Sequence, residues 1–522
     1  MPIEIPERFN AAVHFVDRNL QEGRGGRIAV VHAGRRYTYG DMFDRVSRWG
    51  NVLRTLGLEQ ERRIALLCLD SPEFVVGFFG AIRVGVVPIP MNTLLRPPDY
   101  ELLLKDSRAA VLLVHRALWE PLAPLRHRFD HLRHVVVIGG PSEGCRDYED
   151  LMAQADAHCE PAETSRDDVA FWLYSSGSTG RPKGTVHLQH DMVCCAAAMG
   201  QAVLGLSEDD ITFSAAKLFF AYGLGNNLYF PFSVGATAVL YPERPLPQGI
   251  FEVIRLHRPS VFYAVPTLYA TLLALAERTA ESQGSAQVRD WMRSVRCCVS
   301  AGEPLPPAIF HRWNDLFGLE ILDGIGSTEM LQTFISNRSG RARPGSSGEV
   351  VPGYAARVVD EAGMDVPAGV VGDLLVKGDS AAAYYWNRHQ QSRETFLGEW
   401  VRTGDRYSRD AEGYFWYAGR SDDMLKVGGI WVSPIEVENA LLAHPSVLEC
   451  AVVGFHDRDA MVKPKAFVVL KDGIPPSPEM AVQLQGFVKE TLAPFKYPRW
   501  IEFVPELPKT ATGKIQRFKL RG

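Results

Sequence analysis

The sequence of 522 residues lacks several features, and each absence excludes a class of protein. No uninterrupted apolar run approaches the length of a membrane span, and residues 1–10 carry acids and prolines in place of the apolar core of a signal peptide. The eight cysteines form no CxxC pair, so neither a zinc knuckle nor a disulfide framework is indicated. We therefore expect reduced thiols, a cytoplasmic location and no membrane partner.

A large excess of charge of one sign is also missing. The chain has 56 lysines and arginines against 61 aspartates and glutamates, a net charge of −5, and no basic stripe with interleaved aromatic residues. We therefore expect no nucleic-acid partner. Hydrophobic residues make up 46% of the chain and charged residues 22%, which is typical of a folded globular protein, and the length allows more than one domain.

Strand-like and helical runs alternate along the first half of the chain. Residues 62–70 have the pattern of a strand, residues 71–85 that of a helix and residues 86–92 that of a second strand. Further strand-like runs occupy residues 109–115, 134–140, 211–216, 236–241, 260–266 and 295–306. Such alternation predicts α/β layers with parallel strands. Past Gly340, short β-like pieces separated by glycine predict a small β subdomain that closes the large one.

Charges and glycines cluster in residues 421–429, ahead of a compact stretch that combines a helical run at residues 434–445 with strand-like runs. We place a domain boundary at this cluster. The predicted fold class is therefore α/β, with a large N-terminal domain of α/β layers plus the small β subdomain (residues 1–421). A small mobile α+β C-terminal domain (residues 422–522) follows.

One segment, YSSGSTGRPKGTVH at residues 174–187, lies between the strand-like residues 169–174 and the helical residues 192–204. Its glycines permit close approach of a ligand, and its hydroxyls and Lys183 suit phosphate oxygens, so it predicts a phosphate-binding loop. A Walker A loop is excluded because Pro182 directly precedes the lysine. The alternative is a flexible linker, which the preceding apolar strand disfavours.

Five polar, glycine-containing segments each follow an apolar strand. They are SSGSTGRPKG (175–184), SAGEPLP (300–306), DGIGSTEM (323–330), RTGDRY (402–407) and GRSDDMLKVGG (419–429). Each one alone is typical of an ordinary turn. Together, in this order, they resemble the core motifs of the acyl-adenylate-forming superfamily, which includes acyl- and aryl-CoA synthetases. The run PKTATGKIQR, at residues 508–517, extends the resemblance over almost the whole chain.

The resemblance implies an AMP-forming acid–thiol ligase. In that chemistry a carboxylate oxygen attacks the α-phosphate of ATP and gives an acyl-AMP with release of pyrophosphate. The thiol of coenzyme A then attacks the acyl-AMP and gives a thioester. The implied cofactors and partners are therefore ATP, Mg²⁺, coenzyme A and a carboxylic acid.

The phosphate contacts of the family match the quoted loop and the STE run. By resemblance, the β- and γ-phosphates are held by Ser175, Ser176, Gly177, Ser178, Thr179, Gly180 and Lys183. Thr328 looks like the contact to the α-phosphate, and Glu329 looks like the carboxylate linked to Mg²⁺. A charge placed at a helix N-terminus is the alternative for Glu329.

The nucleoside contacts of the family match three other segments. Asp405 looks like the carboxylate that accepts both ribose hydroxyls, and Arg420 is similar to the arginine that supports ribose and phosphate. The residues expected on the two faces of adenine are Gly302, Glu303, Pro304, Asp323, Gly324 and Ile325.

Lys514 matches the C-terminal lysine of the family, which neutralises the charge that develops between the carboxylate and the α-phosphate. The alternative is a solvated lysine in a charged tail. A catalytic lysine on a separate small domain implies that this domain moves between the half-reactions, with Asp422 at the hinge. In the second arrangement Lys426, Gly428 and Gly429 would face the active site and leave room for the pantetheine arm of coenzyme A.

Residues 216–232 crowd six aromatic side chains among small ones, which favours a flat ring over a long fatty acid. Core packing is the alternative for most of these aromatics. The runs KLFFAYGLGN and STEML resemble those of benzoate-type CoA ligases, so an aryl-CoA ligase is indicated. The residues expected to line its ring pocket are Phe220, Ala221, Tyr222, Gly223, Gly326 and Gln332.

Gln332 departs from the benzoate group, whose members usually carry histidine after STEML. Its amide offers a donor and an acceptor, which favours a substituted ring such as 2-aminobenzoate (anthranilate) or a hydroxybenzoate. Two other functions stay open: loading of a separate carrier protein, and non-catalytic nucleotide binding. The ring substituents, the pathway and the oligomeric state, monomer or homodimer, do not follow from the sequence.

Overall fold

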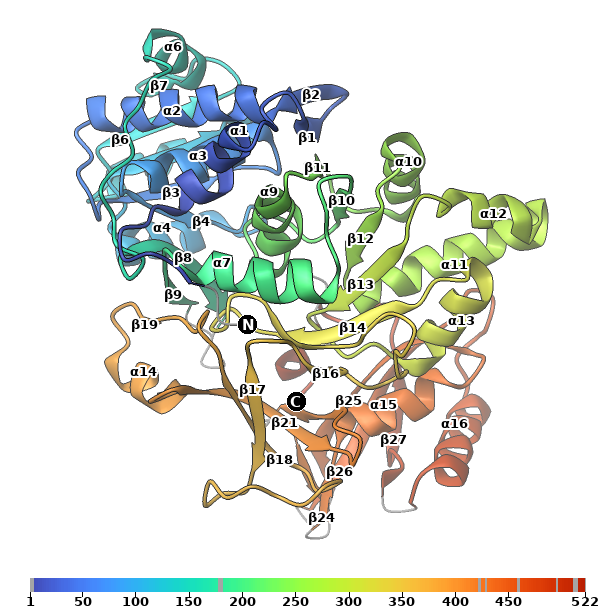
Figure 1. The fold of residues 1–522 in the computed structure, drawn as a ribbon. Helices are drawn as coiled ribbons and strands as arrows, with labels where there is room; N and C mark the ends of the chain where they lie inside the picture. The colour runs from blue at the N-terminus through green and yellow to red at the C-terminus, as the bar shows by residue number, and fades with distance from the viewer. Residues whose placement is uncertain are drawn as a thin grey trace.

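The computed structural model describes residues 4–176, 182–420, 424–427, 430–457, 461–493, 496–509 and 515–521. Two α/β units lie beside each other in Figure 1, one coloured blue and one green to yellow, with the orange and red C-terminal part beneath them. Both units contain largely parallel sheets, and the later strands are antiparallel. The predicted fold class is confirmed.

The first unit is built on a parallel sheet with the strand order β4-β3-β5-β6-β7. Its strands are β3 (Arg63–Leu67), β4 (Val87–Pro90), β5 (Val111–His115), β6 (His134–Ile138) and β7 (Arg146–Asp147). Its helices are α2 (Tyr39–Thr55), α3 (Pro72–Arg83), α4 (Pro97–Ser107), α5 (Arg116–Trp119) and α6 (Tyr148–Gln154). Helix α3 is apolar on every side because it packs against both α2 and the sheet.

The second unit is a nine-stranded sheet with the order β16-β15-β14-β13-β12-β10-β11-β1-β2. Its strands are β1 (Ile28–His32), β2 (Arg35–Thr38), β10 (Ile211–Ser214), β11 (Thr237–Leu240), β12 (Val261–Ala264), β13 (Cys297–Ala301), β14 (Ile321–Gly326), β15 (Thr333–Ser336) and β16 (Glu349–Val350). The six strands from β14 to β1 are parallel, and β2, β15 and β16 are antiparallel at the edges. The connecting helices are α10 (Pro247–His257), α11 (Pro266–Gln283), α12 (Ser285–Trp291) and α13 (Pro307–Phe317).

The described residues on both sides of the expected phosphate loop form two antiparallel strands, called the hairpin below. Strand β8 (Val169–Ser176) pairs antiparallel with β9 (Pro182–Leu188), so the ladder extends further into the glycine-rich run than the sequence indicated. A Cβ at Gly184 would make ordinary van der Waals contacts of 3.4–3.6 Å with Tyr174, Trp386 and Trp172, so packing in the ladder does not require glycine there. Strand β19 (Tyr384–Tyr385) adds to the free edge of β9.

Two helical stretches near this hairpin contain π-helical turns. The helix expected at residues 192–204 is α7 (Asp191–Cys195) continued by the π-helix η3 (Ala196–Val203). The aromatic segment forms α8 (Ala221–Leu224), the π-helix η4 (Gly225–Tyr229) and α9 (Phe230–Val234). Because π-turns are frequent at functional sites, both stretches are candidates for lining one.

The small β subdomain is confirmed. It consists of β17 (Ala355–Val359), β18 (Gly372–Lys377), β20 (Phe396–Leu397), β21 (Trp400–Arg409) and β22 (Phe415–Arg420). All pairings are antiparallel, and the helix α14 (His389–Thr395) precedes β20. A hydrophobic cluster joins this sheet to β15 of the second unit, so the subdomain is anchored to the nine-stranded sheet.

The C-terminal part has its own hydrophobic cluster, packed between a sheet and two helices. Its elements are β23 (Leu425–Val427), β24 (Ile430–Val432), α15 (Pro434–Leu442), β25 (Val447–His456), β26 (Val462–Leu470), α16 (Pro478–Thr491) and β27 (Trp500–Phe503). Ser433 and Ser477 cap the two helices through their hydroxyls. The proposed boundary at residue 422 stays a prediction, because the hinge residue lies outside the described residues.

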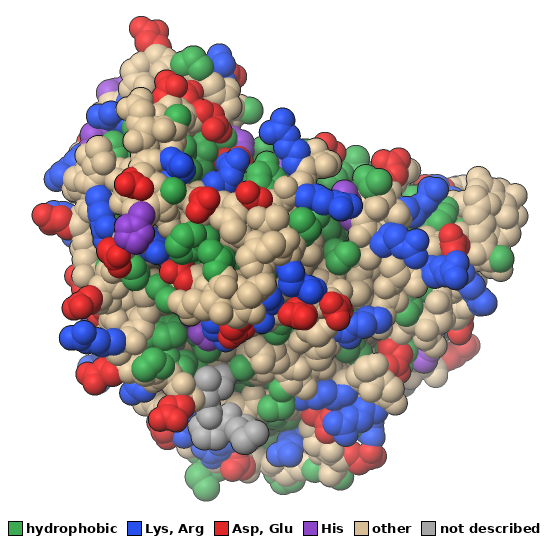
Figure 2. Space-filling model, turned by 45° about the horizontal axis from the view of Figure 1, so that its top comes forward, with side chains coloured by type: hydrophobic (Ala, Val, Ile, Leu, Met, Phe, Trp, Pro, Cys, Tyr) green, Lys and Arg blue, Asp and Glu red, His purple; other side chains and the backbone are tan. Residues whose placement is uncertain are grey.

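The remaining elements are η1 (Val13–Asp17), α1 (Arg18–Gln21), η2 (Ala123–Arg128) and η6 (Arg517–Lys519). All eight cysteines are free thiols, and six of them are buried. On the face drawn in Figure 2, basic side chains are interspersed with acidic ones. Within the described residues, no helix has both the length and the apolar character needed to cross a membrane.

Candidate active site

The two segments expected to enclose adenine lie on neighbouring strands. The parallel register of β13 and β14 places Ser300 beside Asp323 and Ala301 beside Gly324. Asp323 Oδ2 accepts a hydrogen bond from the backbone N–H of Leu305 at 3.3 Å, which fixes the turn of residues 302–304 over the end of β14. The structure therefore brings these predicted residues together.

Asp323 is a buried carboxyl group with an unused oxygen. Burial raises its pKa to about 7, and the Ser300 hydroxyl and the N–H groups of Leu305 and Gly324 oppose that rise. Asp323 Oδ1 and Ser300 Oγ are both buried, and neither meets the criteria for a hydrogen bond with any residue that the structure describes. Because buried polar groups are normally paired, this spot fits a polar group of a ligand.

Thr328 and Glu329 lie in a tight turn that joins β14 to β15. The Thr328 carbonyl accepts from the N–H of Leu331 at 3.1 Å, and the Met330 carbonyl accepts from the N–H of Gln332 at 2.8 Å. Thr328 and Glu329 are half-buried, whereas Met330 and Leu331 are fully buried. The turn therefore presents the two predicted site residues while the next two anchor it in the core.

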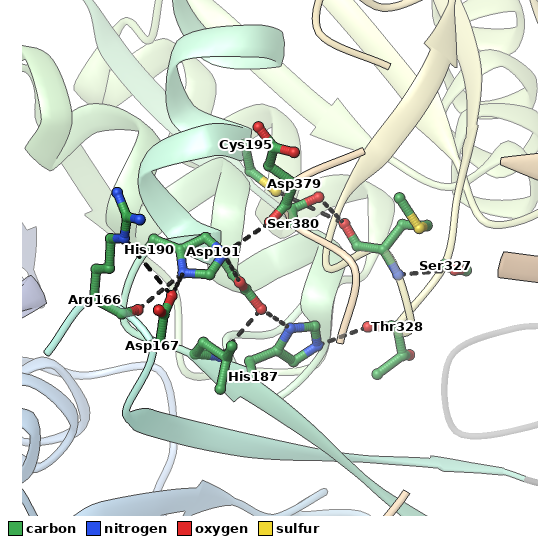
Figure 3. Close-up of polar contacts among 12 residues, drawn as sticks. Arg166, Asp167, His187, His190, Asp191, Cys195, Ser327, Thr328, Asp379 and Ser380 are labelled. Atoms are coloured by element: carbon green, nitrogen blue, oxygen red, sulfur yellow. Dashed lines mark hydrogen bonds and ion pairs between the residues drawn. The ribbon is translucent and has the colours of Figure 1, made fainter. Parts of the chain in front are cut away.

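A buried histidine contacts this turn from strand β9 (Figure 3). His187 Nε2 donates to the Thr328 carbonyl at 2.8 Å, and His187 Nδ1 lies 2.7 Å from Asp191 Oδ2. The side chains of His187 and Asp191 are both 0% exposed. Neither residue was identified from the sequence, because a histidine near the end of a strand and an aspartate at the start of the next helix form no recognisable motif.

Glu329 is also connected to the predicted phosphate-binding lysine. The Tyr385 hydroxyl donates to Glu329 Oε1 at 2.7 Å, and the Lys183 ammonium lies 4.5 Å above the Tyr385 ring. Burial and the nearby Glu329 carboxylate raise the pKa of Tyr385, which keeps the hydroxyl protonated as a donor. Tyr385 was not identified from the sequence, because nothing in the run YYW distinguishes it from a core aromatic.

Asp405 and Arg420 face each other across the ladder of β21 and β22. Arg420 Nη1 lies 3.2 Å from Asp405 Oδ1 and donates to the Thr403 carbonyl at 3.3 Å. The backbone N–H of Asp405 donates to Thr403 Oγ1 at 3.1 Å. The pair expected to hold ribose is therefore preassembled.

The aromatic segment divides into a core part and a partly exposed part. Tyr229, Phe230 and Phe232 are 0% exposed and belong to the hydrophobic core, as the packing alternative predicted for most of these aromatics. Phe220, Ala221 and Tyr222 are among the half-buried residues of the segment. These three are free to line a pocket, and that role stays a prediction.

Packing accounts for the glycines in this region. A Cβ at Gly223 would lie 2.1 Å from the carbonyl oxygen of Lys217, and a Cβ at Gly326 would lie 2.7 Å from that of Gln332. Any larger residue at either position would have to displace the backbone. Their predicted contact with a substrate stays a prediction, because the structure explains both glycines without one.

Gln332 is 3% exposed and uses both ends of its amide within the protein. Its Nε2 donates to the Tyr222 carbonyl at 3.2 Å and to Asn226 Oδ1 at 3.3 Å. Its Oε1 accepts from Thr333 Oγ1 at 3.0 Å. Gln332 therefore connects the STEML turn to α8, and its predicted contact with the ring stays a prediction.

Several predicted site residues lie outside the described residues. They are Gly177, Ser178, Thr179, Gly180, Asp422, Gly428, Gly429 and Lys514. Ser175 lies near the end of β8, and its buried hydroxyl has no hydrogen-bond partner among the described residues. Ser176 and Lys426 are described as strand residues only. Among the residues that the structure describes, no group of three or more His, Cys, Asp and Glu side chains could hold a metal ion.

Two family models match the chain. The model described as AMP-binding enzyme matches residues 16–386, and the model described as AMP-binding enzyme C-terminal domain matches residues 436–514. Together they cover both parts of the fold.

Individual relatives match over nearly the full length. The chain is 52% identical to the benzoate–CoA ligase of Thauera aromatica, over 99% of this chain and 97% of that protein. It is 45% identical to the 4-hydroxybenzoate–CoA/benzoate–CoA ligase of Rhodopseudomonas palustris, over 98% of this chain and 94% of that protein. The solved structure of the anthranilate CoA ligase AuaEII in complex with anthranoyl-AMP has a TM-score of 0.93 and 46% identity, and covers 99% of this chain and 97% of that one. The chain belongs to the AMP-binding enzyme family, within its benzoate–CoA ligase-like group.

Proposed function

We propose that the chain is an AMP-forming aryl-CoA ligase, which converts a benzoate-type acid, ATP and coenzyme A into aryl-CoA, AMP and pyrophosphate. The observation that carries the proposal is the contact chain of Lys183, Tyr385 and Glu329, which brings two motifs from different sheets together. A cation for phosphate and a carboxylate for a hard metal ion are both needed to bind ATP with Mg²⁺. A protein that had lost catalysis would have no need to keep them adjacent.

In the first half-reaction the acid carboxylate attacks the α-phosphate, and pyrophosphate leaves. Lys183 and the hydroxyls of its hairpin would hold the β- and γ-phosphates, and Thr328 would contact the α-phosphate. Glu329, oriented by the Tyr385 hydroxyl, would help hold Mg²⁺, which would neutralise phosphate charge. The donor set fits, since the half-buried carboxylate is orientated by a protonated hydroxyl.

The nucleoside would lie over the ends of β13 and β14. Adenine would sit between residues 302–304 and 323–325, where a ligand N–H would satisfy the unused Asp323 Oδ1. Asp405 would accept the ribose hydroxyls, and Arg420 would hold that carboxylate in place.

The second half-reaction requires the C-terminal domain to move. Lys514 would act during adenylation, and rotation at Asp422 would then bring Lys426, Gly428 and Gly429 toward the aryl-AMP. The thiol of coenzyme A would attack the carbonyl carbon, and AMP would leave.

We propose benzoate or a substituted benzoate as the acid. The relatives reported above are named for benzoate, 4-hydroxybenzoate and anthranilate, and all three are flat aromatic acids. The half-buried aromatic rings of Phe220 and Tyr222, with the small Ala221 between them, would suit contact with a flat ring. We further propose that the protein acts in the cytoplasm as a monomer or homodimer, with its cysteines reduced.

The experiment is a panel of benzoate, anthranilate and the three hydroxybenzoates, assayed for pyrophosphate release with and without coenzyme A. We expect release with at least one acid, and aryl-CoA formation with free coenzyme A. Adenylation without aryl-CoA would favour loading of a separate carrier protein. No pyrophosphate release with any aromatic acid would refute the proposed function.

A further inference from the structure

Two parts of the proposed ATP site come from different sheets. Lys183 lies on β9 of the hairpin sheet, whereas Thr328 and Glu329 lie in the turn between β14 and β15 of the nine-stranded sheet. His187 lies further along β9 and donates from Nε2 to the Thr328 carbonyl at 2.8 Å (Figure 3). This bond joins the strand of the phosphate-binding lysine directly to the turn of the α-phosphate contact.

Both ring nitrogens of His187 face acceptors. Nε2 faces the Thr328 carbonyl, which can only accept, so Nε2 carries a hydrogen and donates it, while Nδ1 shares a hydrogen bond with the Asp191 carboxyl group. Asp191 Oδ2 also accepts from the N–H of Leu188 at 3.1 Å, and the imidazole stacks on Phe171 with the ring centroids 5.2 Å apart. These contacts fix the plane of the imidazole ring and therefore the direction of its bond to Thr328.

The turn that receives this bond is strained. Leu331 has a φ of +64°, in the left-handed region that leucine rarely adopts. Its N–H donates to the same Thr328 carbonyl that His187 contacts. Backbone of this kind persists where the surrounding structure holds it, so the outside contacts of the turn matter for its shape.

Three successive carbonyls of the turn are held from outside it. The Thr328 carbonyl accepts from His187 Nε2, the Glu329 carbonyl from the N–H of Ala382 at 2.7 Å, and the Met330 carbonyl from the Ser380 hydroxyl at 2.9 Å. Among these three contacts, only the hydrogen bond from His187 comes from β9, the strand that also carries Lys183. The other two come from the segment that leads into β19.

We propose that His187, oriented by Asp191, is a positioning residue for adenylation that fixes the Thr328–Glu329 turn relative to Lys183. This inference rests on the proposed function. Both motifs act on one ATP molecule, so their separation sets where the α-phosphate lies when the phosphate chain is held. After pyrophosphate has left, Lys183 no longer holds phosphates that are joined to the AMP part. The distance between Lys183 and the Thr328–Glu329 turn then has less effect, so the thioester step depends less on His187.

The test compares two amide substitutions in the full-length protein. In His187→Asn the amide nitrogen falls near the place of Nδ1, so it can reach Asp191 but not Thr328. In His187→Gln the amide nitrogen falls near the place of Nε2, so it can still donate to the Thr328 carbonyl. The two variants therefore differ mainly in the bond that carries the proposal.

A misplacement of about 1 Å costs on the order of 100-fold in rate, so His187→Asn should lower the adenylation kcat about 10- to 100-fold. The KM for the aromatic acid and the rate of thioester formation from synthetic aryl-AMP should each change less than about 3-fold. His187→Gln should restore the adenylation kcat to within about 5-fold of wild type. His115→Asn, on β5 of the other sheet, is the matched control and should leave adenylation unchanged.

Equal losses in both half-reactions, or no difference between the Asn and Gln variants, would overturn the proposal and indicate a merely structural histidine. A second measurement on the wild-type protein does not depend on the folding of any variant. Its ¹⁵N histidine spectrum should show a proton on His187 Nε2, the donor to the Thr328 carbonyl, and an unprotonated Nε2 would also overturn the proposal. Failure of the wild-type protein to release pyrophosphate would instead refute the proposed function.

Discussion

The hydroxyl of Tyr385 offers a sharp test of the connection between the two phosphate motifs. Tyr385→Phe removes the donor to Glu329 Oε1 but keeps the ring that lies 4.5 Å below the Lys183 ammonium. The substitution therefore separates the orientation of Glu329 from the packing of Lys183.

The magnitude follows from the kind of hydrogen bond that is lost. A hydrogen bond to a charged group contributes about 1.5–3 kcal/mol. Glu329 is half-buried, so water can partly replace the hydroxyl and the lower end applies. About 1.5 kcal/mol corresponds to a change of roughly 10-fold.

We expect Tyr385→Phe to lower the kcat/KM for ATP in pyrophosphate release by about 10-fold and to raise the Mg²⁺ concentration needed for half-maximal rate. The KM for the aromatic acid should change little, because Tyr385 contacts Glu329 and Lys183, the residues proposed to bind Mg²⁺ and phosphate. Tyr384→Phe is the matched control, since that neighbouring side chain is 39% exposed. If the two variants have the same ATP and Mg²⁺ dependence as wild type, Tyr385 does not orient Glu329.

Three further outcomes are expected. Burial raises the pKa of Asp323 to about 7, above its ordinary value of 3.8, so its contribution to the free energy of unfolding declines as pH rises through that interval. Denaturant titrations should accordingly show Asp323→Asn gaining stability relative to wild type between pH 4 and pH 8, and a constant difference would contradict the burial argument. Gln332→Ala should lower the free energy of unfolding by about 1–3 kcal/mol and reduce the rate with all benzoates alike, because both ends of its amide are bonded within the protein. A loss confined to amino- or hydroxybenzoates would show instead that Gln332 contacts the ring. Lys514→Ala should abolish adenylation yet still convert synthetic aryl-AMP and coenzyme A to thioester, and loss of both half-reactions would argue against domain alternation.

The layers of the fold could be predicted because their signals are local. The apolar runs at residues 62–70 and 109–115 became the neighbouring parallel strands β3 and β5, and the run at residues 71–85 became the buried helix α3. Hydrophobic periodicity, and the glycine and proline residues that end helices and strands, extend over only a few residues. They can therefore be recognised without knowing which elements pack against each other. The hairpin of β8 and β9 was missed in part, because a run rich in glycine and serine has the composition of a loop.

The sequence by itself determined the chemical class of the site. Its motifs carry Lys183, Thr328, Glu329, Asp405 and Arg420. Each motif is a short run of residues, so its residue types and their spacing can be recognised in the sequence alone. The order of these turns was enough to identify the family.

Only the tertiary structure decided which side chains outside the motifs support them. Tyr385 reaches Glu329 across 56 residues of chain, and His187 reaches Thr328 across 141 residues. These contacts arise because β19 adds to the edge of β9 and because β9 lies against the turn after β14. The pairing and packing of distant strands depend on the whole core, whereas the character of a turn depends on its own few residues, so no local pattern could have disclosed these two bonds.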